Sequence, residues 1–137
     1  MQTDPTRNTV TINIEANGEI GFSVDTETGK PPQIVNTITA RGGDLVRWQI
    51  GKNRVAANNP IYKVTIALME EQLFYGNDNC WILTPESKKP TQASVIQGAA
   101  AGREFGLSVN VILWDQTSPK ARVFIVDVST QKRKRVK

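Results

Sequence analysis

Residues 9–25 of the chain read TVTINIEANGEIGFSVD. Apolar and polar side chains alternate over residues 9–15 and again over residues 20–25, which is the period of a half-buried β-strand. Asn17-Gly18 lies between the two segments, and this dipeptide is the commonest signal for a two-residue type I′ turn. The stretch therefore predicts a β-hairpin in which each strand buries one face.

The same kind of pattern continues along the rest of the chain. We expect further strands at residues 33–39, 45–50, 61–68, 80–83, 93–97, 105–114 and 121–128, separated by turns that contain Gly, Pro and Asn. One helical turn is expected at residues 69–74. Seven to nine short strands without a long helix predict an all-β fold, an antiparallel β-sandwich of two sheets.

The basic residues are concentrated at the end of the chain. Lys and Arg number 17 against 13 Asp and Glu, and five of the 17 lie in the last six residues. These five are Lys132, Arg133, Lys134, Arg135 and Lys137. We therefore predict a single β-sandwich domain over residues 1–131 and a basic tail over residues 132–137. The tail is either a solvated terminus or an arm that contacts the phosphates of nucleic acid.

The composition excludes several classes of site. The chain of 137 residues has no histidine, which excludes a Ser-His-Asp triad, a Cys-His pair, a zincin helix and an ordinary copper site. We find no constellation that predicts catalysis, a metal or a cofactor. Asn77-Asp78-Asn79 supplies too few oxygens for calcium and is expected to be a turn.

Cys80 is the only cysteine, so no disulfide can form within the chain. The first residues contain no signal-peptide core, and no apolar run approaches the roughly 18 residues that a membrane span needs. We therefore expect an intracellular, cytoplasmic protein that does not enter a membrane. Nearby Asp78 disfavours a reactive thiolate, so Cys80 is expected to be a small packing residue.

Residues 36–49, NTITARGGDLVRWQ, resemble a stretch common in cupredoxin-like sandwiches. In that family a strand leads through Gly-Asp into an alternating strand that carries a core Val and Trp, here Val46 and Trp48. The resemblance implies a cupredoxin/immunoglobulin-like Greek-key sandwich that is closed by the strands at residues 105–114 and 121–128. Members that bind copper use two histidines and a cysteine, often with a methionine, and place the cysteine in the last hairpin, well after the position of Cys80. Because the chain has no histidine, we expect the fold without the electron-transfer function.

Val123, Phe124, Ile125 and Val126 form an unbroken apolar run in a domain whose other strands alternate. A sandwich strand that is apolar on both faces is covered either by loops of its own chain or by another copy. Ile112 and Trp114 lie on the face opposite Leu107, Val109, Val111 and Leu113. They join the four residues of the apolar run as interface candidates.

These observations lead to three hypotheses about function. The first is a non-catalytic module that acts by self-assembly, as a homo-oligomer, or by binding a protein partner. The second is a nucleic-acid-associated protein tethered by the tail at residues 132–137. The third is a small-ligand or carbohydrate-binding module in which an exposed Trp81 or Trp114 stacks on the ligand.

Overall fold

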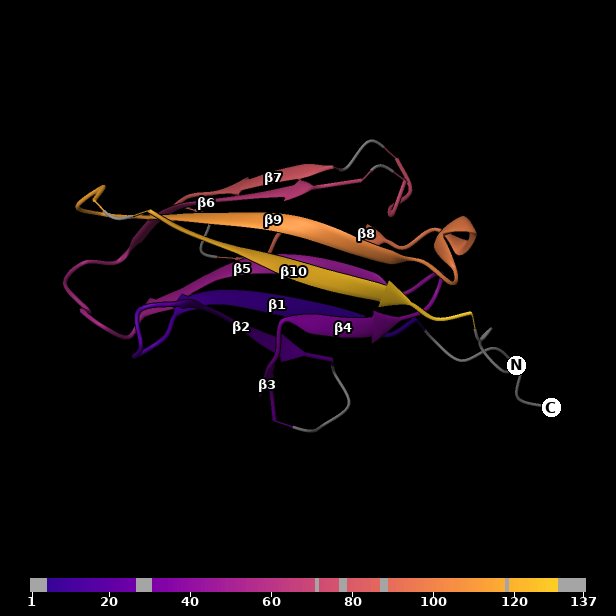
Figure 1. Ribbon diagram of the computed structural model, residues 1–137, viewed down its shortest axis with the longest axis horizontal. Helices are drawn as coiled ribbons and strands as arrows, with labels where there is room; N and C mark the ends of the chain where they lie inside the picture. The colour runs from indigo at the N-terminus through magenta and orange to yellow at the C-terminus, as the bar shows by residue number, and fades with distance from the viewer. Residues whose placement is uncertain are drawn as a thin grey trace.

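The computed structural model describes residues 5–26, 31–70, 72–76, 79–86, 89–117 and 119–130. In these residues two five-stranded sheets pack face to face, so the predicted all-β sandwich is confirmed (Figure 1). The strands are β1 (Arg7–Ile14), β2 (Ile20–Asp25), β3 (Gln33–Ile34), β4 (Thr37–Ala40), β5 (Leu45–Asn53), β6 (Ile61–Leu68), β7 (Cys80–Leu83), β8 (Ser94–Val95), β9 (Glu104–Leu113) and β10 (Lys120–Val128). A 3₁₀ turn, η1 (Gly98–Ala100), is the only helical element of this part. No helix among the described residues is long and apolar enough to cross a membrane.

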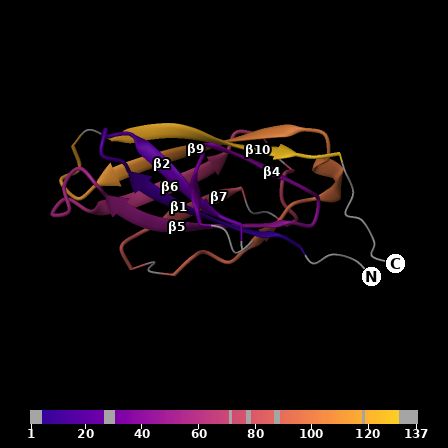
Figure 2. The ribbon, with the colours of Figure 1, turned by 90° about the horizontal axis from the view of Figure 1, so that it is seen from below.

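The first sheet has the strand order β3-β2-β1-β5-β8 and the second has the order β4-β10-β9-β6-β7. Most neighbouring strands are antiparallel, but β1 pairs in parallel with β5, and β10 pairs in parallel with β4. Parallel neighbours need a long connection between them. The chain therefore visits other strands before it returns to each parallel partner, and Figure 2 shows β4 beside β10.

The predicted hairpin is present, but its turn is of a different type. The Glu15 N–H donates to the Glu19 carbonyl at 2.8 Å, so three residues form the loop between β1 and β2. Gly18 has a φ of +86°, whereas Asn17 has a negative φ, and a type I′ turn requires a positive φ at both central residues. The Asn17 side-chain oxygen accepts the Glu19 N–H at 3.0 Å, and this local bond stabilises the three-residue loop.

The buried carboxylate of Asp44 closes the turn that precedes β5. Its Oδ2 accepts the Arg41 N–H at 3.0 Å, and its Oδ1 accepts the Thr6 N–H at 3.1 Å. The first bond fixes the turn and the second ties it to the residue before β1. Asp44 therefore helps to place β5 beside β1.

Replacing Asp44 with alanine is expected to lower the free energy of unfolding by about 2–3 kcal/mol, because two backbone N–H groups lose a charged acceptor. Asp44→Asn keeps one acceptor oxygen and is expected to cost less than the alanine variant. Urea unfolding followed by circular dichroism measures both. An unchanged midpoint in Asp44→Ala would show that these two bonds add nothing to stability.

The segment predicted as one strand, residues 33–39, forms two strands in different sheets. β3 pairs with β2, and β4 pairs with β10. Val35 still hydrogen-bonds to β2, whereas Asn36 already hydrogen-bonds to β10. The chain therefore leaves the first sheet between these two residues, and Ile34 is exposed while Ile38 is buried.

Alternation in the sequence groups Tyr62 with Val64, Ile66 and Leu68 on one face, and a helical turn is predicted at residues 69–74, but both details are wrong. The pairing of β6 with β9 shifts next to Ile61, which becomes buried, and Tyr62 is turned out of the core. No helical turn forms in the described part of residues 69–74, where Phe74 instead makes a β-bridge to Ile96. Both differences arise because cross-strand partners, and not local propensity, set the backbone there.

A series of five aromatic rings connects the two sheets through the core. Phe22 lies 4.9 Å from Phe124, which lies 5.6 Å from Trp48. Trp48 lies 6.0 Å from Trp81, which lies 5.5 Å from Phe74. Trp48 has no exposed surface, as predicted, and Trp81 packs against the core. These contacts hold β2 and β5 against β10 and β7.

Candidate interaction surface

The outer face of the first sheet is polar. On β1, β2 and β5 most apolar side chains point inward, and alternation turns the intervening residues outward, among them the partly exposed Leu45. On the edge strand β3, Ile34 is the cross-strand partner of Ser23 and is also exposed on this face. The outward set includes Thr9, Thr11, Ser23, Arg47 and Gln49. The Arg47 Nε donates to Thr9 Oγ1 at 2.7 Å, so even the charged side chain is bound to its own sheet. This face is an ordinary solvated surface.

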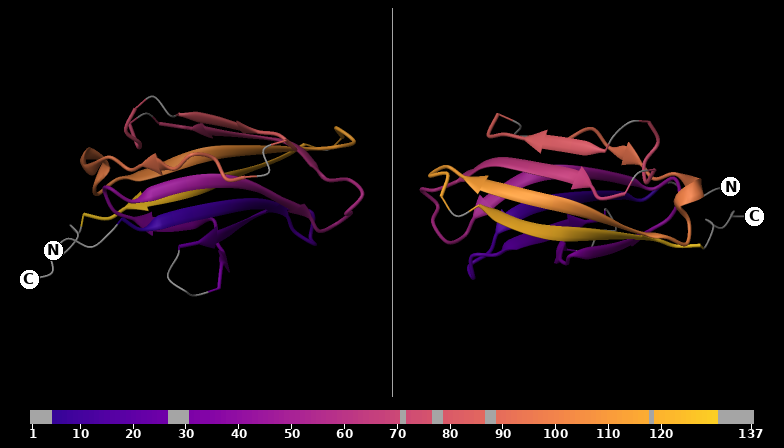
Figure 3. Two further views of the ribbon diagram at one scale, coloured as in Figure 1. Left: turned by 180° about the vertical axis from the view of Figure 1, so that it is seen from behind. Right: turned by 45° about the horizontal axis from the view of Figure 1, so that its top comes forward.

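The outer face of the second sheet carries most of the exposed large apolar side chains, although polar residues such as Asn110 and Thr65 lie among them. Among the described residues eight large apolar side chains are exposed, and five of them belong to this face. The five are Tyr62, Met69, Ile82, Trp114 and Val123, with exposed fractions between 37% and 63%. We call these five, together with the partly exposed Ile112 and Ile125, the outer apolar face. Figure 3 shows β9 and β10, two of the strands that carry it, side by side.

The four residues of the predicted interface run in β10 divide between the two sides of the sheet. Phe124 and Val126 are fully buried between the sheets, whereas Val123 is 40% exposed and Ile125 is partly exposed. Only the latter two therefore have surface to offer a partner. Ile112 also points outward, and Trp114 is 59% exposed at the end of the same strand. Tyr62, Met69 and Ile82 were missed, because no sequence pattern places them beside β10.

The outer apolar face has two unlike ends. At one end the Trp114 and Tyr62 rings meet edge to face with centroids 5.4 Å apart. At the other end Met69 covers the bare backbone of Gly106, where a Cβ would lie 3.0 Å from its sulfur, and Ile125 is the cross-strand partner of that glycine. One end is therefore aromatic, and the other is aliphatic with a flexible thioether.

Charge is confined to the two ends as well. Glu104 and Asp127 are direct cross-strand partners beyond the Met69 end, and both are exposed. Neither forms an ion pair with another described residue, whereas nearby Glu70 is paired with Arg103 at 3.2 Å. Like charges directly opposite each other destabilise a sheet. Lys63 pairs with Ile112 near the other end, so Glu104 and Asp127 lie at one end of the face and this lysine lies near the opposite end.

Cys80 is exposed, so the prediction that it packs in the core is wrong. β7 lies at the edge of the second sheet, and its alternation turns Trp81 and Leu83 inward. Cys80 and Ile82 consequently point outward, next to the outer apolar face. The sequence did not show which side of so short a strand would be buried.

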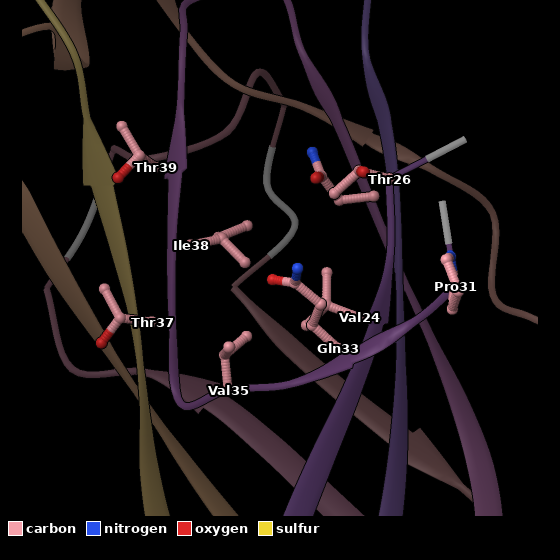
Figure 4. Close-up of a pocket in the computed structure, with 9 residues that line it drawn as sticks. Val24, Thr26, Pro31, Gln33, Val35, Thr37, Ile38 and Thr39 are labelled. Carbon is pink, nitrogen blue, oxygen red and sulfur yellow. The ribbon is translucent and has the colours of Figure 1, made fainter. Parts of the chain in front are cut away.

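The described residues that line a slot at the edge of the sandwich form no catalytic arrangement. The slot, about 330 Å³ in volume, lies where β2 and β3 separate from β4. In Figure 4, Val24 and Ile38 point into the slot, whereas Thr37 and Thr39 point to the other side of β4. Every lining side chain is apolar, an amide or a hydroxyl: Asn8, Val24, Thr26, Pro31, Gln33, Val35, Thr37, Ile38 and Thr39. None of these described side chains can therefore transfer a proton or balance a charge in the slot.

Two exposed carboxyl groups have perturbed acidities of local origin. The Thr117 N–H donates to Asp115 Oδ1 at 3.0 Å, and this bond lowers the pKa of Asp115 below its usual value. A side-chain hydrogen bond from Thr84 lowers the pKa of Glu86 in the same way. Both shifts stabilise the ionised carboxylate in a turn, so neither carboxyl is tuned as a general acid.

Lys132, Arg133, Lys134, Arg135 and Lys137, the residues predicted to contact nucleic acid, lie outside the described residues. Within the described part no three His, Cys, Asp or Glu side chains gather as metal ligands would. No protein-family model matches the chain, and no curated protein matches its sequence. Among the described residues, the outer apolar face is therefore the strongest candidate for a functional surface.

Proposed function

We propose that the protein is a non-catalytic module that self-assembles, binding a second copy of itself through the outer apolar face. The supporting observation is the contrast between the two sheets. One presents mainly Thr, Ser, Gln and Arg to solvent, with Ile34 at its edge, and the other presents five of the eight exposed large apolar side chains. A clustered apolar patch of this kind is characteristic of an interaction surface, whereas scattered exposed residues are not.

The size of the second sheet suits a stable dimer. At about 4.8 Å between strands and about 3.4 Å per residue, its five strands give a plan area of about 570 Å² before the flanking Met69 and Trp114 are added. A standard protein interface buries about 800 Å² on each partner. The face also carries small residues such as Ala67 and Ser108 at its centre, so a second sheet can approach it closely there.

The distribution of charge favours a second copy as the partner. The face carries opposite charges at its two ends, since Glu104 and Asp127 lie at one end and Lys63 lies near the other. In a two-fold dimer, the contact between the Glu104 and Asp127 end of one copy and the Lys63 end of the other occurs twice. The two carboxylates of each copy, which form no ion pair with another described residue, then lie near a cation of the other copy.

The sandwich is further proposed to be cupredoxin-like, in a form without the copper ligands. In support, the turn closed by Asp44 leads into β5, on which Val46 and Trp48 are fully buried. The last two strands, β9 and β10, form an antiparallel pair within the second sheet, as the resemblance implies. Electron transfer is not part of this proposal, since the chain has no histidine.

Light scattering during size-exclusion chromatography tests self-assembly. We expect the wild-type chain to elute with twice its 15.1 kDa mass, and Val123→Glu to elute as a folded monomer. The substitution places a charge in the middle of an apolar contact, where it would lose its hydration without gaining a partner. The dissociation constant is therefore expected to rise more than 100-fold, which is about 2.7 kcal/mol.

Gln49→Glu is the matched control, because it adds the same charge to the outer face of the other sheet. It is expected to leave the dimer unchanged, and circular dichroism confirms that both variants are folded. A monomeric wild-type chain at high concentration would refute the proposal. Equal dissociation by both variants would show that the contact is not on the outer apolar face.

A further inference from the structure

The orientation of the two copies follows from the unlike ends of the outer apolar face, and this inference rests on the proposed function. Two stacked sheets related by a two-fold axis have two simple arrangements. The axis lies between the sheets and runs either along β9 or across the strands. We infer that it runs across the strands, so that the β9 strands are antiparallel and Lys63 of each copy lies near Glu104 and Asp127 of the other.

Electrostatics separates the two arrangements. With the axis along β9, Glu104 of one copy would face Glu104 of the other. Asp127, the cross-strand partner of Glu104 in each copy, would add a further carboxylate on either side. Desolvating like charges against each other is costly. With the axis across the strands, the acidic end of each copy instead covers the Lys63 end of the other, and both pairs of ends are complementary.

The apolar side chains favour the same arrangement. It places the Met69 and Ile125 end of one copy over the Trp114 and Tyr62 end of the other. A flexible thioether packs well against aromatic rings and fills irregular gaps between them. The alternative arrangement would stack aromatic on aromatic and methionine on methionine, and it would leave the two ends unevenly filled.

Charge reversal in mixed samples tests the orientation. By symmetry, Lys63→Glu or Glu104→Lys alone turns two attractive contacts into two repulsive ones, so each variant is expected to dimerise about tenfold to thirtyfold more weakly than wild type. An equimolar mixture of the two variants is expected to restore dimers, since every contact in the mixed dimer is again between opposite charges. Native mass spectrometry counts the mixed and unmixed dimers.

The control is a mixture of wild type with Glu104→Lys, which is expected to show no preference for the mixed dimer. In the arrangement with the axis along β9, Glu104 of the wild-type copy would face the lysine introduced at position 104 of the other, and this control would form mixed dimers preferentially. That outcome would overturn the inferred orientation while leaving self-assembly intact. A monomeric wild-type chain would instead overturn the proposed function, so the two failures are distinguishable.

Cys80 supplies an independent measurement on the unsubstituted chain, since it is the only cysteine and is exposed. With the axis across the strands, β7 lies over β7 of the other copy, and the two thiols are separated by little more than the sheet spacing of about 10 Å. A bismaleimide of about that length is expected to cross-link the wild-type dimer and not Val123→Glu. With the axis along β9, β7 of one copy would lie over β4 of the other, and the two β7 strands would be about 19 Å apart laterally. A dimer that is not cross-linked would therefore contradict the inference.

Discussion

Replacing Phe124 with alanine is expected to lower the free energy of unfolding by about 3–5 kcal/mol. Phe124 has no exposed surface and lies between two aromatic rings, Phe22 at 4.9 Å and Trp48 at 5.6 Å. Truncation removes the buried ring, leaves a cavity and breaks two edge-to-face contacts. Because small domains are stable by only about 5–15 kcal/mol, this single change is expected to remove a large part of the total stability.

The control is Val123→Thr, one residue earlier in β10. Val123 is on the outer side of the sheet, and threonine keeps its β-branched shape, so the expected change is below about 1 kcal/mol. Urea unfolding of both variants is compared at a concentration at which light scattering shows monomer, because assembly would add stability of its own. Similar losses for the two variants would contradict the assignment of opposite faces to these neighbours.

The strands that were predicted correctly carry a strong local signal. Residues 9–15 and 20–25 alternate because one face of each strand is buried and the other is solvated, and this period is visible without knowledge of the partner strand. The same reasoning placed Ile112 outside and Trp48 inside, and both positions are confirmed. Local alternation thus predicts which residues share a face of a strand.

Features that depend on distant segments were not predictable in this way. β5 lies beside β1 because the chain crosses to the second sheet at Val35, forms β4 there and crosses back in the turn before β5. No local pattern marks the first of these crossings. The outward turn of Tyr62 depends on an irregularity in the pairing with β9. A period-2 pattern cannot reveal a register shift, because one residue of slippage reverses the side that each residue faces.

The outer apolar face was only partly predictable for the same reason. Val123 and Ile125 belong to an apolar run, so the sequence marks them as unusual. Met69 and Ile82 are single apolar residues near turns, and they join the face only because the strand order brings β6 and β7 next to β9. An interaction surface on a sandwich is a property of strand order, which sequence periodicity does not contain.

At Trp48 the stabilising effect of ring packing can be measured separately from the cost of the buried indole N–H group. It is fully buried between Trp81 at 6.0 Å and Phe124 at 5.6 Å, and no described residue accepts a hydrogen bond from its indole Nε1–H. A buried donor without an acceptor costs about 1–3 kcal/mol. The large ring therefore stabilises the core by packing, while its N–H group opposes part of that gain.

We accordingly expect Trp48→Ala to lower the free energy of unfolding by about 3–5 kcal/mol, and Trp48→Phe to lower it by less than about 2 kcal/mol. Phenylalanine leaves a smaller void than alanine and removes the N–H group that has no acceptor. Urea unfolding of the two variants, followed by far-ultraviolet circular dichroism so that tryptophan emission is not needed, gives the comparison. If Trp48→Phe were as destabilising as Trp48→Ala, the indole N–H would have to be making a stabilising contact, and the core around β5 would be held by that contact as well as by ring packing.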